Sequence, residues 1–264
     1  MQAPGSLPSM PVSSALAHPD MYDGGTVRSG PALSIIIPCY NECGNVEPLF
    51  RAVERALPHL HWELIFVDDS SPDGTIGEVW RLAQADSRVR GILRVGRRGL
   101  SSAVIEGVLS SSAPVVAVMD GDMQHDERLL ARMFDAIQNQ GYEVAIGSRH
   151  VEGGDNSGLA NAWRLFLSDA GIRIAQHFLS VRISDPMSGF FAVRRDLFVS
   201  CVARLSGTGF KILLDMLMAQ KTAPRVVELP FVFRSRHEGE SKMDRKVLLQ
   251  FGQMIAHHVF ARKK

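Results

Sequence analysis

A turn with two carboxylates and one side-chain amide, those of Asp120, Asp122 and Gln124, follows directly on an apolar run at residues 115–119. Hard oxygen ligands at this spacing suit Mg²⁺ or Mn²⁺ that bridges a diphosphate, because neither metal requires nitrogen or sulfur. Taken alone, an Asp-x-Asp pair is more often a solvated acidic turn. Polar clusters that follow the other predicted strands favour the metal site here.

A second acidic turn, residues 68–75, begins with the adjacent carboxylates of Asp68 and Asp69. Such a turn can simply cap the next helix, because Asp, Ser and Thr side chains accept hydrogen bonds from the amides at a helix start. Two adjacent carboxylates exceed what a cap requires. One of them could accept hydrogen bonds from the ring N–H groups of a nucleobase or from a ribose hydroxyl.

Any phosphate group must be held by side chains or by metal. The sequence contains neither G-x-G-x-x-G after its first apolar run nor G-x-x-x-x-G-K-[ST], which excludes a Rossmann dehydrogenase and a P-loop NTPase. Arg149, Arg236 and Lys242 are the candidate cations. Residues 233–242 form either a surface loop with solvated cations or a flap that closes on phosphate oxygens, where Arg binds two oxygens at once.

The elements that position these side chains follow from the hydrophobic pattern. From Leu33 onward, short apolar runs alternate with segments of helical period, which is typical of a mainly parallel, Rossmann-like α/β sheet flanked by helices. Because the carboxyl ends of parallel strands share one edge, the polar clusters should meet in one crevice. The predicted strands are Leu33–Pro38, Glu63–Val67, Val89–Val95, Val115–Met119 and Glu143–Ser148, and the predicted helices are Val46–Leu57, Ile76–Ala85, Leu100–Ser110 and Arg128–Gln138.

The second half of the chain has a looser pattern and elaborates the same domain, which we place at residues 31–244. It predicts a helix over Leu159–Leu179, a loop that contains Asp185, a helix over Lys211–Gln220 and a strand over Arg225–Phe233. Residues 1–30 carry Pro, Gly and Ser without the apolar block of a signal peptide, so they are predicted to be a disordered tail.

Composition limits the class of protein. The 264 residues are 45% apolar and 22% charged, which is ordinary for a globular domain, and the net charge of +1 argues against a protein that coats nucleic acid. Cys39, Cys43 and Cys201 have no second Cys/His pair to complete a zinc site, so packed or solvated thiols are favoured. The sequence contains no run of about 18 apolar residues, so no membrane-spanning helix is predicted.

Residues 245–264 predict an amphipathic C-terminal helix with basic residues at both ends. The helix could pack on the domain, or it could lie on an anionic membrane surface or dock a membrane partner. Its apolar face would consist of Val247, Leu248, Phe251, Met254, Ile255 and Val259.

Together these segments resemble the dolichol-phosphate mannose synthase branch of glycosyltransferase family 2, whose catalytic domain has the GT-A fold. The resemblance covers residues 33–245 and rests on six motifs, at residues 38–42, 68–75, 120–125, 147–149, 184–190 and 233–242. The sequence departs from the family pattern in three places. Cys39 stands in place of Thr, Gly121 replaces Ala, and residues 97–101 (Arg-Arg-Gly-Leu-Ser) replace Lys-x-Gly-Leu-Gly.

The resemblance implies transfer of mannose from GDP-mannose to a dolichyl or polyprenyl phosphate, with inversion and with Mg²⁺ or Mn²⁺. It implies a cytoplasmic protein held peripherally at the cytoplasmic face of a membrane, either directly or by a membrane-anchoring subunit. It assigns the nucleoside site to Pro38, Tyr40, Glu42, Val67 and Asp69; the sugar-nucleotide contact to Asp120, Gly121 and Asp122; the metal to Asp120, Asp122 and Gln124; and the phosphates to Arg149, Arg236 and Lys242.

A dedicated general base is not expected, because the second pKa of a phosphomonoester is about 6 and the acceptor arrives as an anion. Asp215 would be suspected if a base were needed, with a role on the helix surface as the alternative. Arg164 could meet the acceptor phosphate or be a solvated helix residue. Two other functions stay open: a UDP-glucose or UDP-aminosugar transferase to the same lipid, and a sugar-nucleotide-binding subunit without turnover.

Overall fold

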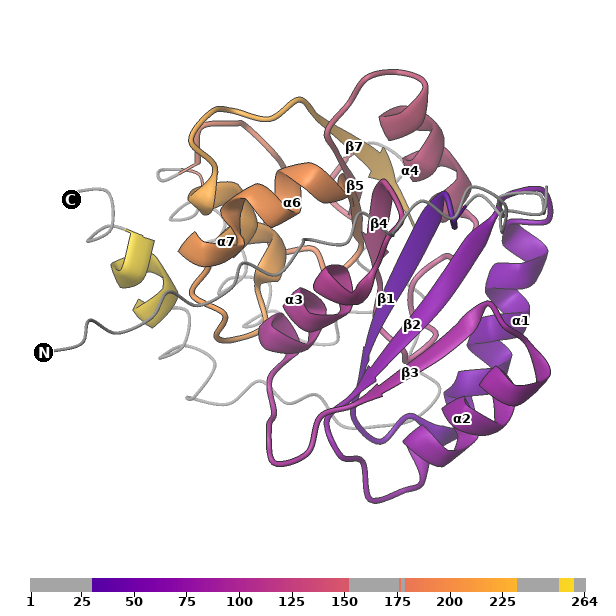
Figure 1. The fold of residues 1–264 in the computed structure, drawn as a ribbon. Coiled ribbons are helices and arrows are strands. Elements are labelled where there is room, and N and C mark those ends of the chain that lie inside the picture. Colours follow the sequence, from indigo (N-terminus) through magenta and orange to yellow (C-terminus); the bar gives the residue numbers. More distant parts are fainter. Residues whose placement is uncertain (1–29, 152–175, 177–178, 232–251, 259–264) are drawn as a thin grey trace, which may run out of the picture.

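Residues 30–151, 176, 179–231 and 252–258 are described by the computed structural model of the chain. Their strands are β1 (Leu33–Cys39), β2 (Trp62–Asp68), β3 (Val89–Leu93), β4 (Val115–Val118), β5 (Val144–Ser148), β6 (Phe191–Arg194) and β7 (Val226–Pro230). They form one seven-stranded sheet in the order β3-β2-β1-β4-β6-β5-β7 (Figure 1). All pairings are parallel except those of β6, which runs antiparallel between β4 and β5.

Helices cover both faces of this sheet (Figure 1). One face packs against α1 (Val46–Ala56), α2 (Thr75–Ala85) and α4 (Leu129–Gln138), and the other against α3 (Leu100–Ser110), α6 (Arg195–Cys201) and α7 (Ile212–Ala219). Two single 3₁₀ turns, η1 (Cys43–Asn45) and η2 (Val202–Arg204), precede α1 and follow α6.

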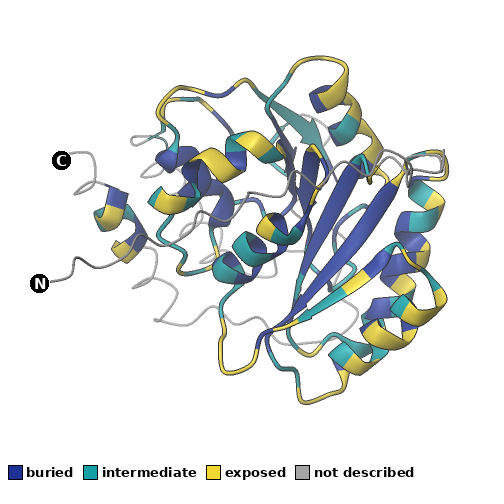
Figure 2. Ribbon diagram, in the orientation of Figure 1, coloured by how far each residue is buried: buried dark blue, intermediate teal, exposed yellow. Residues whose placement is uncertain are grey.

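The central strands are buried on both faces, as Figure 2 shows for β1 and β2. Along β1, Ile35 and Ile37 contact the core beneath α1 and α2, whereas Ile36 contacts the core beneath α3. Because both sets of alternating side chains are enclosed, the strand consists of a continuous apolar run. This is the pattern from which the strands were predicted.

The prediction of a mainly parallel α/β domain is confirmed. Each of the five strands and four helices predicted before residue 150 is present, with bounds that shift by at most two residues. The helix predicted over Lys211–Gln220 is α7, and the strand predicted over Arg225–Phe233 is the shorter β7. The cysteines are free thiols, as expected.

The strand β6 and the helix α6 were not predicted from the sequence. β6 has only four residues and follows directly on the loop at residues 184–190, so its short apolar run was not predicted as a strand. The predicted tail at 1–30 and the predicted helix over Leu159–Leu179 lie almost entirely outside the described residues. Of the predicted C-terminal helix, residues 252–258 are described, and they are helical.

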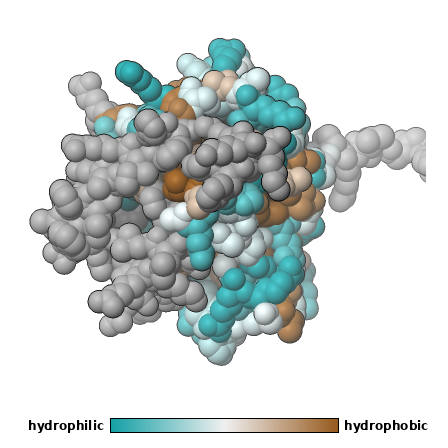
Figure 3. Space-filling model, turned by 90° about the vertical axis from the view of Figure 1, so that its left-hand side faces the viewer, coloured by the Kyte–Doolittle hydropathy of each residue, from teal (hydrophilic) through white to brown (hydrophobic). Residues whose placement is uncertain are grey.

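The large hydrophobic side chains exposed on the described surface are those of Trp80 of α2, Leu93 and Val95 at and after the end of β3, Leu109 of α3, Val199 of α6 and Phe210 before α7. One face shows the same mixture of hydrophilic and small hydrophobic areas among the described residues (Figure 3). Scattered apolar residues are usual on a soluble surface. None of the helices in the described ranges is both long enough and apolar enough to cross a bilayer.

Candidate functional site

The turns after β1 and β2 are joined by hydrogen bonds at the carboxyl edge of the sheet. The amide N–H of Asn41 donates to Ser71 Oγ (2.9 Å), that of Glu42 to Thr75 Oγ1 (3.0 Å) and that of Cys43 to Asp73 Oδ2 (3.0 Å). Burial favours a higher pKa for Asp73, but hydrogen bonds from Thr75 and Cys43 outweigh it, so the pKa of Asp73 is lowered. Asp73 Oδ1 also accepts from the amide of Thr75, the first residue of α2, at 3.0 Å, so the side chain of Asp73 satisfies an amide at the helix start.

The adjacent carboxylates at the end of β2 have different partners. Asp68 is fully buried and accepts hydrogen bonds from the amide and hydroxyl of Ser71. Asp69 accepts from Arg94 Nη1 (2.8 Å) and from the amide of Gly99 (2.7 Å). A carboxylate has about four lone-pair sites, so Asp69 retains acceptor capacity for a ligand. Arg94 is a buried cation that was not selected from the sequence. The sequence shows only a charged residue near the end of a predicted strand, and it does not show the partner of that residue.

The predicted metal turn is anchored by His125. Its ring is buried, stacks on Phe190 at a centroid distance of 4.9 Å and meets the edge of Phe231 at 5.7 Å. Nδ1 accepts a hydrogen bond from the amide of Asp120 at 3.2 Å. Burial lowers the pKa of His125 to about 4, so the ring is neutral near pH 7. His125 therefore positions the backbone of the turn.

Within this turn, Asp122 Oδ1 accepts from the amide of Gln124 (3.2 Å), and Met123 has a positive φ of 63°. The side chain of Asp120 is 37% exposed. Among the described residues, no three His, Cys, Asp or Glu side chains group closely enough to hold a metal ion.

The loop at residues 184–190 approaches the metal turn closely. A Cβ atom placed on Gly189 would lie 3.2 Å from Asp120 Oδ2. Gly121 is less crowded, since a Cβ there would lie 3.4 Å from Ile37 and 3.5 Å from Glu42. Alanine, the residue of the family pattern, therefore fits at position 121.

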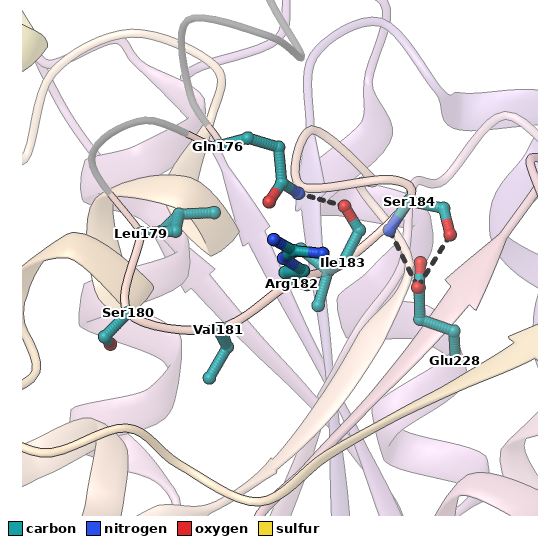
Figure 4. Close-up of a pocket in the computed structure, with 8 residues that line it drawn as sticks. All are labelled: Gln176, Leu179, Ser180, Val181, Arg182, Ile183, Ser184 and Glu228. Atoms are coloured by element: carbon teal, nitrogen blue, oxygen red, sulfur yellow. Dashed lines mark hydrogen bonds between the residues drawn. The ribbon is translucent and has the colours of Figure 1, made fainter.

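An ion pair connects this loop to the end of β5. Arg149 Nε donates to Asp185 Oδ2 at 3.0 Å, and Asp185 is fully buried. Glu228 of β7 accepts from the amide and hydroxyl of Ser184 (2.7 and 2.9 Å) and from the amide of Asp185 (3.0 Å), and Figure 4 shows the Ser184 contacts beside an open groove. Asp185 thus orients the loop. Glu228 was not recognised from the sequence, because its partners lie more than 40 residues away.

Lys211 is a further cation that sequence reasoning did not select. It precedes α7, and its Nζ donates to the carbonyl of Met187 at 3.4 Å. Its pKa is lowered, first by burial and then by the charge of Arg149, whereas the nearby carboxylates of Asp185 and Asp120 oppose the shift. Lys211 therefore lies beside the same loop and the same ion pair.

The interpretation of Asp215 as a helix-surface residue is wrong, because its side chain is fully buried. It accepts hydrogen bonds from the amide and hydroxyl of Ser206 (3.0 and 2.8 Å) and pairs with His258 Nε2 at 2.6 Å. Burial favours a higher pKa, but the hydrogen bonds from His258 and Ser206 lower the pKa of Asp215. Asp215 joins α7 to the C-terminal helix (residues 252–258), and Met254 of that helix packs on Leu214.

The structure brings together the predicted residues after β1, β2, β4 and β5. Tyr40 lies under the guanidinium of Arg98, with 4.4 Å between the guanidinium carbon and the ring centroid. Glu42 accepts from Asn45 Nδ2 at 2.7 Å, while Pro38 and Val67 are paired residues of β1 and β2. Arg164, Arg236 and Lys242 lie outside the described residues.

Solved glycosyltransferases share this arrangement of strands and helices. Glucosyl-3-phosphoglycerate synthase from Mycobacterium tuberculosis, in complex with Mn²⁺, UDP-glucose and phosphoglyceric acid, matches with a TM-score of 0.58 at 20% identity, over 87% of this chain and 79% of that one. A mannosyltransferase from Pyrobaculum calidifontis, in complex with GDP-Man and Mn²⁺, matches with a TM-score of 0.59 at 16% identity, over 90% of this chain and 66% of that one. At these identities the likeness establishes the fold.

Closer relatives are found by sequence. The dolichol-phosphate mannosyltransferases of Pyrococcus furiosus and Saccharomyces cerevisiae are 41% and 35% identical over 83% and 84% of this chain. The chain spans 61% of the length of the first relative and 85% of the second. Residues 34–200, which carry the two acidic turns and the Arg149–Asp185 pair, match the model of glycosyl transferase family 2, and the chain belongs to that family.

Proposed function

We propose that the protein transfers a mannosyl group from GDP-mannose to the phosphate of a dolichol or other polyprenol, with inversion. The observation that carries the proposal is the close approach of the 184–190 loop, with its Arg149–Asp185 pair, to Asp120 in the metal turn. Such an arrangement suits two anions that must react with each other. The names of the relatives support mannose as the sugar and a lipid phosphate as the acceptor.

The metal turn fits a hard divalent cation. Asp120, Asp122 and Gln124 supply oxygen donors alone, and the partial exposure of Asp120 leaves room for a bound diphosphate. We propose that these three residues hold Mg²⁺ or Mn²⁺, and a metal held there would neutralise the charge of the departing diphosphate. We propose that Gly121 meets the sugar nucleotide through its backbone, which an alanine at this position would also present.

The acceptor phosphate would need no dedicated base, because it is already ionised near neutral pH. We propose that Arg149 and Lys211 hold it, since a guanidinium carries five N–H donors, more than the pair with Asp185 uses. Catalysis would then consist of positioning and charge neutralisation. Arg236 and Lys242 are proposed to hold the leaving diphosphate, and Arg164 to meet the acceptor phosphate.

The nucleoside would lie at the ends of β1 and β2. Pro38, Tyr40 and Glu42 would line one side of this site, and Val67 and Asp69 the other. The hydrogen bonds between the two turns support this assignment, because they hold both walls in place before a ligand binds.

The reaction is proposed to take place at the cytoplasmic face of a membrane, where the phosphate of a polyprenol is exposed. The chain would reach this surface through its C-terminal helix or through a membrane-anchoring subunit. In the described part of that helix, Met254 and His258 face α7, whereas Gln253 and His257 are exposed. The packing alternative for this helix therefore has structural support over residues 252–258.

The experiment compares GDP-mannose, UDP-glucose and UDP-N-acetylglucosamine as donors to a polyprenyl phosphate in detergent or vesicles, with Mn²⁺, Mg²⁺ or chelator. We expect a mannosylated lipid from GDP-mannose alone and none in chelator. A glycolipid formed only from a UDP-sugar would instead establish the alternative transferase. Tight binding of GDP-mannose without any product would establish a non-catalytic subunit.

A further inference from the structure

Arg98 lies at the mouth of the proposed nucleoside site. It belongs to the loop between β3 and α3, and its guanidinium carbon is 4.4 Å from the centroid of the Tyr40 ring. The residue is exposed, and no hydrogen bond or ion pair links its side chain to the part of the chain that the structure describes. A cation–π contact at an exposed site is worth only about 0.5–1 kcal/mol, so a ligand can readily replace it.

The backbone that carries Arg98 is fixed although the side chain is exposed. The next residue, Gly99, donates its amide N–H to Asp69 Oδ2 at 2.7 Å. Arg94 donates to Asp69 Oδ1 at 2.8 Å and to the carbonyl of Gly99 at 3.1 Å. Gly99 also has a φ of 143°, in the region that favours glycine. The base of the Arg98 side chain is thereby held one residue from the contact with Asp69.

The neighbouring arginine behaves differently. Arg97 is 58% exposed and pairs with Glu106 of α3 at 3.0 Å. Glu106 also lies 3.4 Å from Nε of the buried Arg94. Arg97 therefore belongs to a surface ion-pair network on α3, whereas Arg98 turns toward the end of β1. The two adjacent cations make a matched pair for experiment.

The two charged groups around this site complement guanine. Guanine presents N–H donors at N1 and N2 and, on its other edge, the acceptors O6 and N7. A carboxylate such as that of Asp69 accepts from the first edge, and an arginine binds O6 and N7 together through two parallel N–H bonds. Uracil has no second acceptor corresponding to N7, so it cannot accept both bonds.

We propose that Arg98 leaves Tyr40 when the sugar nucleotide binds and reads the O6/N7 edge of its guanine base. Arg98 is thus a specificity-determining residue for the nucleobase. The inference rests on the proposed function, because it takes GDP-mannose as the donor.

The test measures the affinities of the wild type, Arg98→Ala, Arg98→Lys and the control Arg97→Ala for GDP, 7-deaza-GDP and UDP by calorimetry with Mn²⁺. The deaza analogue lacks only the N7 acceptor. We expect Arg98→Ala to weaken GDP binding roughly 5- to 150-fold, the range of a bidentate arginine–guanine contact. The wild type should distinguish GDP from 7-deaza-GDP, and Arg98→Ala should bind both alike. Arg98→Lys retains the positive charge, but it should not distinguish GDP from 7-deaza-GDP. Arg97→Ala should have the same nucleotide affinities as the wild type.

Two results would overturn the inference in different ways. If Arg98→Ala discriminates between GDP and 7-deaza-GDP as well as the wild type does, Arg98 does not read the base, and the proposed function stands. If the wild type itself prefers UDP to GDP, the proposed function fails and the inference fails with it. Thermal unfolding of each variant separates a loss of affinity from a loss of folded protein.

Discussion

The contact between Gly189 and Asp120 permits a sharp test of the metal turn. The change Gly189→Ala places a Cβ atom 3.2 Å from Asp120 Oδ2, closer than ordinary van der Waals contact, so the carboxylate or the loop must move by a few tenths of an ångström. A misplacement of about 1 Å in an active site can cost roughly 100-fold in rate. A shift of this smaller size should therefore lower kcat about 3- to 10-fold.

Gly121→Ala is the matched control in the same turn. The added Cβ would make ordinary contacts with Ile37 at 3.4 Å and Glu42 at 3.5 Å, so no ligand oxygen has to move. Neither glycine has a φ in the left-handed region, and alanine lowers the entropy of the unfolded chain by the equivalent of about 0.4–1 kcal/mol. We expect Gly121→Ala to retain wild-type turnover within about twofold and to unfold at an equal or higher temperature.

The assay follows mannolipid formation at several Mn²⁺ concentrations, together with thermal unfolding. Gly189→Ala should need more metal for half-maximal rate and should stay folded. The reasoning is refuted if Gly189→Ala and Gly121→Ala have the same turnover and metal dependence. Unfolding of Gly189→Ala at assay temperature would show that the crowding acts on the fold and not on the carboxylate.

Three further predictions concern the metal, the C-terminal helix and the proposed flap. Asp122→Ala should abolish turnover but leave the unfolding temperature within a few degrees, since a ligand at the sheet edge contributes little to the core; near-normal activity in chelator would contradict the metal assignment. His258→Ala should lower the free energy of unfolding by about 1–3 kcal/mol, because it removes a hydrogen bond from buried Asp215. Since the folded-state pKa of Asp215 is lowered, the ionised carboxylate stabilises the fold above its unfolded pKa of about 3.9, and this stabilisation is lost as the pH falls through the folded-state pKa. An acid unfolding curve that is unchanged by Asp215→Asn would argue against the pair of Asp215 and His258. Arg236→Ala and Lys242→Ala should lower turnover more than affinity for free nucleotide, as compared by steady-state kinetics and calorimetry, and a loss confined to binding would make them ground-state anchors.

The strands and helices of the first half could be predicted because each is a local pattern. A strand that is enclosed on both faces shows as a continuous apolar run, and the helices between the strands repeat with a period near 3.6. β6 was missed for the opposite reason, since its four residues give no periodicity and its antiparallel place between β4 and β5 depends on contacts with distant strands. Hydrophobic patterns carry no information about such an insertion.

The residues of the candidate site show the same distinction between local patterns and contacts with distant residues. The carboxylates of Asp69, Asp120 and Asp122 follow directly on predicted strands, so their location at one edge could be predicted from sequence. Arg94 and Glu228 could not be identified, because a lone charged residue in an apolar context has no defined role until its partner is known. Their partners are 25 and 44 residues away in the chain.

Arg94 and Glu228, which were not predicted from the sequence, hold predicted site residues in place. Asp69 is backed by buried Arg94, and the ion pair of Asp185 with Arg149 is held by Glu228 through backbone amides. Removal of a buried partner leaves the other charge unpaired in the interior, which commonly costs about 3–5 kcal/mol of stability. Loss of a partly exposed carboxylate such as that of Asp120 leaves no unpaired charge in the interior. We therefore expect mutations of Arg94 and Glu228 to lower mainly the free energy of unfolding. Mutations of the exposed carboxylates in the turns should affect mainly ligand binding, so the two effects can be separated.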